Sequence, residues 1–125
     1  MPEFGSSSRK NLGQTNKKLQ AIFNKVIEHI DCSVICGYRG KEEQNEAYAK
    51  GNSKLKYPES KHNVLPSEAV DVVPYPVDWK DIKRFKEFGQ FVKGVAVGMD
   101  IEIVWGGDWK RFKDYPHFQL KENDE

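Results

Sequence analysis

The sequence has no run of about 18 consecutive apolar residues, the length that a membrane span would need. It also lacks a strong charge of one sign, since 20 basic and 19 acidic residues leave a net charge of +1. A dedicated nucleic-acid-binding protein usually carries a clear basic excess, so this balance argues against that class. The opening residues 1–6 lack the apolar segment of a secretory signal peptide. We therefore expect a protein made in the cytoplasm without membrane insertion, which needs another route out if its substrate lies outside.

Cysteine and histidine are both scarce. The two cysteines, Cys32 and Cys36, are too few for a disulfide framework. They flank the apolar segment Ser-Val-Ile, and this favours a buried strand in which they act as small hydrophobic side chains. A disulfide or half of a zinc site is the less favoured interpretation. The three histidines are His29, His62 and His117, and His29 lies off the apolar face of a predicted helix, so we expect it to face solvent.

The length of 125 residues, with 38% hydrophobic and 31% charged residues, is typical of one globular domain. Apolar residues at helical spacing between 19 and 30 predict an amphipathic helix, capped by Thr15 or Asn16. Further helices are predicted over 41–50, ending at Gly51, and from a cap at Asp78 to near Gly98. Short strands are predicted over 32–36, 69–73, 101–105 and 117–120.

These elements do not form a regular βαβ repeat. The sequence therefore predicts an α+β fold, with a small antiparallel sheet flanked by helices. Residues 1–125 form a single domain in this interpretation. Residues 1–15 are polar and rich in serine and glycine, and are interpreted as an N-terminal arm that packs locally. Residues 121–125 are interpreted as a flexible tail.

Asp71 stands in the middle of the apolar segment 69–73. A carboxylate in so apolar a strand is unfavourable unless a partner stabilises its charge. By strand alternation it could instead face solvent, opposite Val70 and Val72. His117 lies between a proline and an aromatic residue, where a buried structural histidine is an equally good explanation.

Taken together, His62, Asp71 and His117 suggest a metal site. Two imidazoles and one carboxylate leave zinc a fourth position for water, which is typical of catalytic rather than structural sites. We therefore predict one zinc ion per chain. A hydrolase also needs a proton acceptor beside that water, and Asp114, three residues before His117, is well placed for this role.

Two segments resemble a known family. Residues 60–74, SKHNVLPSEAVDVVP, resemble the first zinc-binding motif of the L-alanyl-D-glutamate and D-alanyl-D-alanine peptidases, which share their fold with hedgehog signalling domains. The segment WGGDW at 105–109, continuing to DYPHF at 114–118, resembles the second motif. The similarity is especially close to the phage endolysin branch and extends over nearly the whole chain. It also covers Phe4, Gly5, Ser8, Gly37, Tyr38, Arg39, Gln44, Tyr48 and Gly51.

The resemblance implies roles for individual residues. It implies that His62, Asp71 and His117 bind zinc, that Asp114 is the catalytic base, and that Arg39 binds the substrate or the developing oxyanion. One departure is visible, because the step from the first histidine to the aspartate is nine positions here and seven in many members. We expect the longer loop to alter the rim of the cleft more than the metal site.

Other contacts are predicted less directly. Ser60 and Trp109 are expected to contact substrate, although Ser60 could equally form a turn. Gln44 is expected to bind substrate or, with Tyr48 one helical turn away, to brace Arg39. Asp108 could orient a ligand imidazole or close the turn at Gly106 and Gly107.

The resemblance implies a zinc-dependent peptidoglycan endopeptidase of the endolysin type that cuts the L-alanyl-D-glutamate bond of stem peptides, acts on the wall after release, and is a monomer. A D-alanyl-D-alanine carboxypeptidase and a non-catalytic wall-binding domain of the same fold are the alternatives. Two further alternatives are less favoured. One is a muramidase that uses two carboxylates, and the other is a hydrolase that uses Cys32 or Cys36 as its nucleophile.

Overall fold

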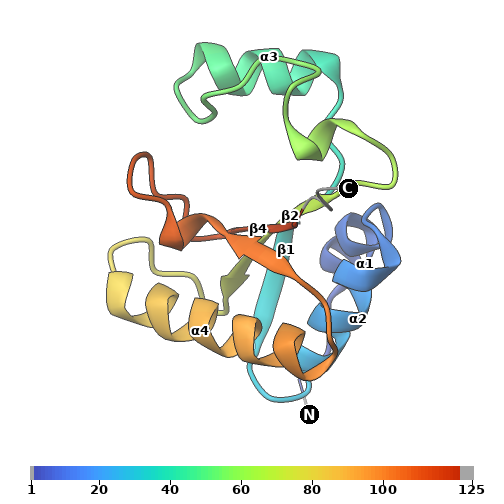
Figure 1. Ribbon diagram of the computed structural model, residues 1–125, viewed down its shortest axis with the longest axis vertical. Helices are drawn as coiled ribbons and strands as arrows, with labels where there is room; N and C mark the ends of the chain where they lie inside the picture. Colours follow the sequence, from blue (N-terminus) through green and yellow to red (C-terminus); the bar gives the residue numbers. More distant parts are fainter. Residues whose placement is uncertain (1, 122–125) are drawn as a thin grey trace.

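The computed structural model describes residues 2–121, so most of the predicted tail at 121–125 lies outside the described residues. Four helices pack around four strands (Figure 1). The helices are α1 (Ser6–Gly13), α2 (Lys17–Val26), α3 (Lys41–Ala49) and α4 (Ile82–Gly98). The strands are β1 (Cys32–Cys36), β2 (Ala69–Pro74), β3 (Ile103–Trp105) and β4 (His117–Leu120), and two short 3-10 turns are η1 (Lys61–Asn63) and η2 (Gly106–Asp108).

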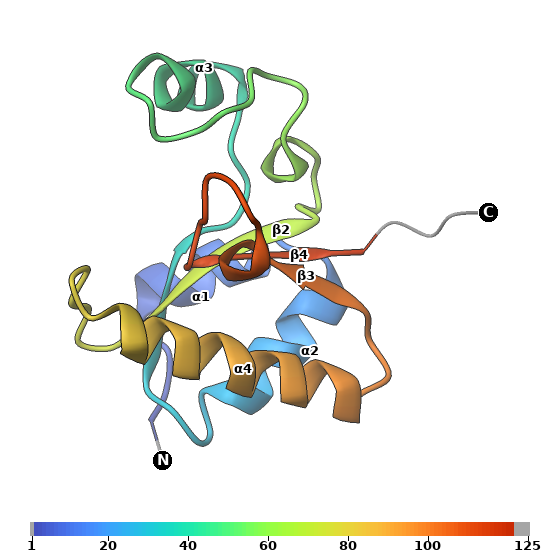
Figure 2. The ribbon, with the colours of Figure 1, turned by 60° about the vertical axis from the view of Figure 1, so that its left-hand side comes forward.

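The strands form one antiparallel sheet in the order β1-β2-β4-β3. The predicted α+β class and small antiparallel sheet are therefore confirmed. Helices α2 and α4 lie against one side of the sheet, whereas α3 stands on the other side and apart from the core (Figures 1 and 2). This arrangement leaves the sheet surface below α3 uncovered by any long helix among residues 2–121.

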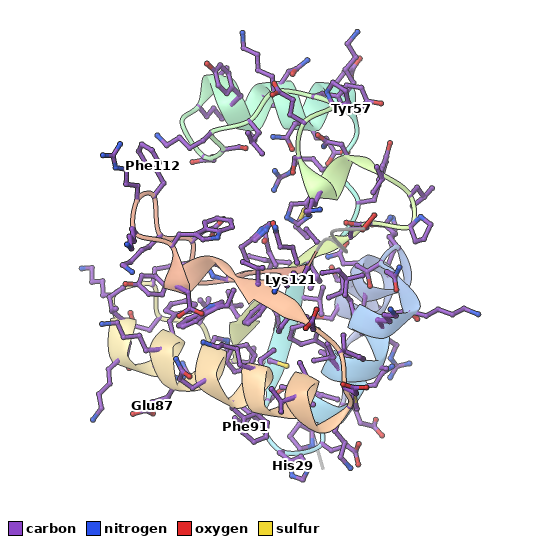
Figure 3. The ribbon with its side chains drawn as sticks, in the orientation of Figure 1. His29, Tyr57, Glu87, Phe91, Phe112 and Lys121 are labelled. Carbon is purple, nitrogen blue, oxygen red and sulfur yellow. The ribbon has the colours of Figure 1, made fainter. Side chains whose placement is uncertain are left out.

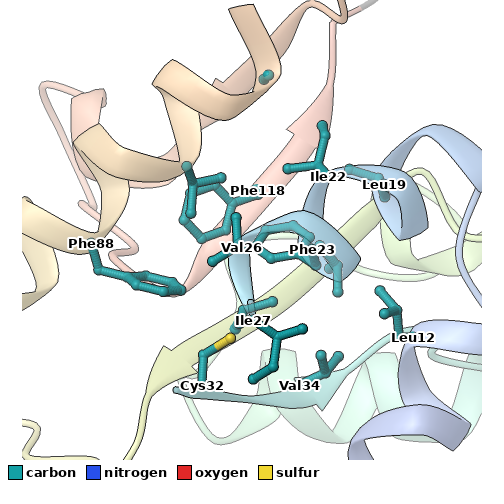
Figure 4. Close-up of a cluster of buried hydrophobic side chains, with 14 of the residues drawn as sticks. Leu12, Leu19, Ile22, Phe23, Val26, Ile27, Cys32, Val34, Phe88 and Phe118 are labelled. Atoms are coloured by element: carbon teal, nitrogen blue, oxygen red, sulfur yellow. The ribbon is translucent and has the colours of Figure 1, made fainter. Parts of the chain in front are cut away.

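The core lies between α2, α4 and the sheet (Figure 4). Helix α2 contributes a stripe of four fully buried side chains at helical spacing: Leu19, Ile22, Phe23 and Val26. Full burial of each such side chain contributes about 1.5–3 kcal/mol. Phe23 meets Phe118 of β4 edge to face at 5.3 Å between ring centroids. The back of β4 is thus fixed by core packing, while its other face is free to carry polar groups.

The N-terminal segment is more ordered than its composition predicts. The residues interpreted as an arm form helix α1, and Phe4 and Leu12 are buried in the core. Ser8 is also buried, and its Oγ accepts a hydrogen bond from the Val34 amide at 3.0 Å. The serine-rich composition concealed this helix because its stability comes from packing on β1 rather than from its own periodicity.

Several boundaries differ from prediction. Helix α2 ends at Val26, earlier than the predicted residue 30, and Asn16 caps it as predicted by accepting from the Lys18 amide. Asp81, rather than Asp78, caps α4 by accepting from the Arg84 amide. The Asp78 carboxylate instead accepts from the Lys80 amide in a turn. Among residues 2–121, no helix combines the length and the apolar character needed to cross a membrane.

Candidate metal centre and active site

The register of two neighbouring strands brings the predicted ligands together. Asp71 of β2 lies directly opposite His117 of β4 in the antiparallel ladder, so both side chains emerge on the same face. His62 approaches this pair from η1. Asp71 Oδ1 lies 3.3 Å from His117 Nδ1 and 3.3 Å from His62 Nε2, and the two imidazole centroids are 5.2 Å apart. The solvent-facing interpretation of Asp71 is therefore wrong, because the carboxylate is partnered by both rings.

These three side chains fit a metal ion. In a tetrahedral zinc site with bonds of about 2.0–2.1 Å, neighbouring ligand atoms lie roughly 3.3 Å apart. The two distances from Asp71 Oδ1 match that spacing. His62 and His117 are 2% and 7% exposed, so the donors already lie in a buried, preformed site. Two groups that share Asp71 could each hold a metal ion: Asp71 with Cys36 and His62, and Asp71 with Asp114 and His117.

The outer nitrogen of each ring is held in place. His62 Nδ1 lies 2.7 Å from the Gly37 carbonyl oxygen, and His117 Nε2 lies 2.8 Å from Gln119 Oε1. A carbonyl oxygen can only accept, so these outer nitrogens carry protons. The lone pairs of His62 Nε2 and His117 Nδ1 would face the cluster once those nitrogens are deprotonated for metal binding. Gln119 was not predicted, although its position two residues after His117 in a strand places it on the same face.

Burial and mutual charge shift the pKa values of the cluster. Burial alone would lower the pKa of His62, but the Asp71 carboxylate outweighs it and raises that pKa to about 10. Burial would raise the pKa of Asp71, but the charge of His62 and hydrogen bonds from both imidazoles hold it well below its usual range. The Asp71 carboxylate and the protonated His62 imidazole thus form a strong ion pair. A metal ion bound here would displace the imidazole proton.

Asp114 lies at the edge of this cluster. Its Oδ2 is 4.0 Å from His117 Nδ1, and its side chain is 44% exposed. Burial, and then the neighbouring Asp71 charge, raise the pKa of Asp114. The close backbone approach depends on Gly106, because a Cβ there would overlap the Asp114 carbonyl oxygen, and the Asp114 amide donates to Gly106 O at 3.0 Å. The carboxylate is thus placed beside the ligands but open to the cavity.

Arg39 also reaches the cluster, with Nη2 3.7 Å from Asp71 Oδ2. Its Nη1 donates to Gln44 Oε1 at 2.9 Å, so α3 fixes the direction of the guanidinium. Gln44 also accepts from Asn63 Nδ2 and donates to Ser53 Oγ and to the Leu55 carbonyl. Gln44 is fully buried, and these hydrogen bonds are those of a residue that braces Arg39, whereas its contact with substrate stays a prediction.

Replacing Gln44 by alanine should therefore weaken the fold and displace Arg39. Each buried partner left without a hydrogen bond costs about 1–3 kcal/mol, so we expect a loss of that order in the free energy of unfolding. Denaturant titration measures it, with Gln90→Ala on the exposed side of α4 as the matched control. An unchanged midpoint for Gln44→Ala would show that this network contributes nothing.

The two cysteines behave differently, and both are free. Cys32 is buried as predicted, and burial together with Asp31 raises the pKa of its thiol to about 12. Cys36 is only partly buried, and its Sγ lies 3.8 Å from His62 Nδ1 and 3.6 Å from Arg39 Nη2. A purely hydrophobic role for Cys36 is thus wrong. Its sulfur also belongs to one of the two groups that could hold a metal ion, together with His62 and Asp71.

The remaining predicted contacts have mixed outcomes. Ser60 caps η1, with Oγ accepting from the His62 amide at 3.2 Å, so the turn interpretation holds. The Trp109 ring lies 5.2 Å from that of His117. Asp108 pairs with Lys93 at 2.7 Å and is half-exposed, so it does not orient a ligand imidazole. Tyr48 does not brace Arg39 either, because its ring lies under Lys56.

A cavity of about 1050 Å³ opens over the cluster. Its lining includes the three candidate ligands, Arg39, Ser60, Trp109 and Asp114. The lengthened loop at 63–68 does not line it, and Leu65 in that loop is 68% exposed. The expectation that this loop reshapes the cleft rim is therefore wrong, because the extra residues point into solvent.

A paired imidazole–carboxylate cluster at the floor of an open cavity, with a further acid beside it, is typical of metal-dependent hydrolases. A family model described as phage L-alanyl-D-glutamate peptidase matches residues 2–124, and the chain belongs to that family. The predicted resemblance is thus confirmed.

Two relatives carry related names. The peptidoglycan L-alanyl-D-glutamate endopeptidase CwlK of Bacillus subtilis (strain 168) is 32% identical over 107 residues, covering 75% of this chain and 63% of CwlK. The chain therefore matches less than two thirds of that relative. The crystal structure of the Serratia marcescens L-Ala D-Glu endopeptidase ChiX superposes with a TM-score of 0.80 at 30% identity, covering 95% of this chain and 90% of ChiX.

Proposed function

We propose that this chain hydrolyses the L-alanyl-D-glutamate bond of peptidoglycan stem peptides with one zinc ion held by His62, Asp71 and His117. The observation that carries the proposal is the placement of Asp71 Oδ1 at 3.3 Å from an imidazole nitrogen of each histidine, on the floor of an open cavity. Membership of the phage L-alanyl-D-glutamate peptidase family and the names of CwlK and ChiX support the choice of bond.

The choice of zinc follows from the donor set. Two neutral imidazole nitrogens and one carboxylate are the ligands of catalytic zinc, and the fourth position is left for water. When bound, zinc supplies a water of lowered pKa and an electrophile for the scissile carbonyl. The hydrogen bonds from His62 to Gly37 and from His117 to Gln119 fix the ring orientations that such binding requires.

Asp114 is the proposed base. It lines the cavity beside His117, within reach of a water bound at the proposed metal site. It takes the proton of the attacking water and passes it to the amine of the departing D-glutamate residue. The geometry leaves the carboxylate accessible, because its side chain is 44% exposed.

Arg39 is the proposed partner of the oxyanion. Its guanidinium lines the cavity and is held by Gln44 and Asp71, so it can donate to the scissile carbonyl without first being ordered. Trp109 walls the cavity beside His117, and Ser60 retains a hydroxyl proton that can be donated to the substrate backbone.

A digest of purified sacculi tests this proposal. We expect new N-terminal D-glutamate, detected by mass spectrometry after labelling of amines, and no new reducing sugar ends. EDTA should abolish the release and added zinc should restore it. Release of terminal D-alanine alone would indicate a carboxypeptidase, the absence of new amines a binding domain, and insensitivity to EDTA would contradict the zinc assignment.

A further inference from the structure

Three cationic side chains lie along one rim of the cavity. Lys54 comes from the loop after α3, and Arg111 and Lys113 come from the loop between η2 and β4. All three are exposed, and none forms a salt bridge with a carboxylate within residues 2–121. Lys113 directly precedes Asp114 and donates to the Gly107 carbonyl at 3.2 Å. The positive charges of this rim are therefore available to an anion in the cavity.

The two loops are held against each other. Lys54 Nζ lies 4.3 Å from the centroid of the Phe112 ring, a cation–π contact. Phe112 is 67% exposed at the tip of the loop that reaches toward the α3 side (Figure 3). Its φ of 54° is a left-handed conformation that bulky residues rarely adopt. Strain of this kind persists where the surrounding structure imposes it, and here it places an aromatic ring beneath the Lys54 ammonium group.

The charge of the cavity is not that of the whole protein. The net charge of the chain is only +1. The lining contains five basic residues (Arg39, Lys54, Lys61, Arg111 and Lys113) against three acids, of which Asp71 and Asp114 belong to the central cluster. Glu59 is the third acid. The rim thus concentrates positive charge where a ligand enters, which favours binding of an anionic group.

The wall away from α3 has a different character. Ile35, Trp79 and Ile82 line it with exposed apolar surface, and Trp79 stacks on Phe85 at 5.6 Å. The segment that carries Trp79, between β2 and α4, lies beside the start of α4 and away from α3 (Figures 1 and 2). The two sides of the cavity therefore suit different halves of a substrate.

We propose that Lys54, Arg111 and Lys113 form a subsite for the free carboxylate of the D-glutamate residue that follows the scissile bond. A glutamate joined to alanine through its amine, and to the rest of the stem through one carboxyl group, keeps its other carboxylate free. The rim then orients the stem, with the D-glutamate side toward α3 and the alanine side toward Trp79. This inference rests on the proposed function, because it assumes that the L-alanyl-D-glutamate bond is the bond that is cut.

Two synthetic peptides test the subsite. Both are acetyl-L-alanyl-D-glutamyl-L-lysine amides in which the side-chain carboxyl group of the glutamate is joined to the lysine. They differ only in the other carboxyl group of the glutamate, which is free in one peptide and an amide in the other. We expect the parent protein to have a kcat/KM about 10-fold higher for the free carboxylate, the combined effect of a few exposed charge contacts. The preference should appear mainly in KM and should shrink as salt increases.

The triple variant Lys54→Met, Arg111→Met, Lys113→Met should lose this preference and cut both peptides at the rate of the amide. A matched triple variant, Lys80→Met, Lys86→Met, Lys110→Met, removes the same net charge from exposed positions outside the cavity lining. It should keep the parental preference. Zinc content and thermal unfolding of both variants should match those of the parent protein.

Equal cleavage of the two peptides by the parent protein would overturn the subsite while leaving the proposed function intact. The same holds if the rim variant keeps its preference, or if it loses activity on both peptides alike. Cleavage of neither peptide by a parent protein that binds zinc would instead overturn the proposed function, and the subsite with it.

Discussion

Asp114→Asn should bind zinc normally and lose about 10²–10⁴ in kcat, the usual contribution of a positioned acid–base group. The amide has the size of the carboxylate but cannot accept the proton of the attacking water. Because Asp114 is partly exposed and is not one of the three proposed ligands, its loss should leave the fold and the metal in place. Turnover of sacculi, zinc content and thermal unfolding measured on the same preparation separate these effects.

Asp108→Asn is the matched control, since it makes the same change on the neighbouring turn, where the acid pairs with Lys93 away from the cavity. It should retain parental turnover. Parental wall clearance by Asp114→Asn would contradict the assignment of the base.

Asp71→Asn should have the largest effect, because it removes the ligand that both imidazoles share. Zinc content should fall from one ion per chain to nearly none at micromolar protein. A metal-bound electrophile supplies several kcal/mol of transition-state stabilisation, so activity should fall about 10³-fold or more. Metal analysis after dialysis and turnover of sacculi measure the two losses.

His29→Ala is the control for this variant. His29 is exposed and packs against Phe91 on the far side of the core (Figure 3), so its loss should change neither zinc content nor turnover. Circular dichroism should show that Asp71→Asn keeps its secondary structure, because asparagine preserves the volume in β2. One zinc ion per chain in folded Asp71→Asn would contradict the ligand set.

Elements with a strong hydrophobic period were predicted well from the sequence. The apolar stripe of α2 and the glycine after α3 carry local signals that need no tertiary context. Helix α1 carries no such signal, because only Leu12 and Ser8 are buried in it and both depend on contact with β1 and the core. The choice between Asp78 and Asp81 as a cap was equally invisible, since both are good capping residues and tertiary packing decides between them.

The cluster of His62, Asp71 and His117 could be predicted because histidine is rare in the chain and Asp71 occurs in an apolar segment. The groups that hold it were harder to find. The Gly37 carbonyl is main chain and has no side-chain signature, while the burial of Gln44 depends on how α3 folds over Leu55. Cys36 was misjudged because a β-bulge between Val34 and Cys36 shifts the end of β1, and simple alternation does not apply there.

Asp71 of β2 lies opposite His117 of β4, so these two side chains meet only when the two strands are in the correct register. Side chains alternate between faces, so a slip of β4 by one residue would turn His117 toward Phe23 and bring Phe118 to the surface. Such a misaligned chain could not collect its donors around a cation. A metal ion that binds only the chain with the correct register would therefore stabilise that register. Removal of the ion would remove this stabilisation.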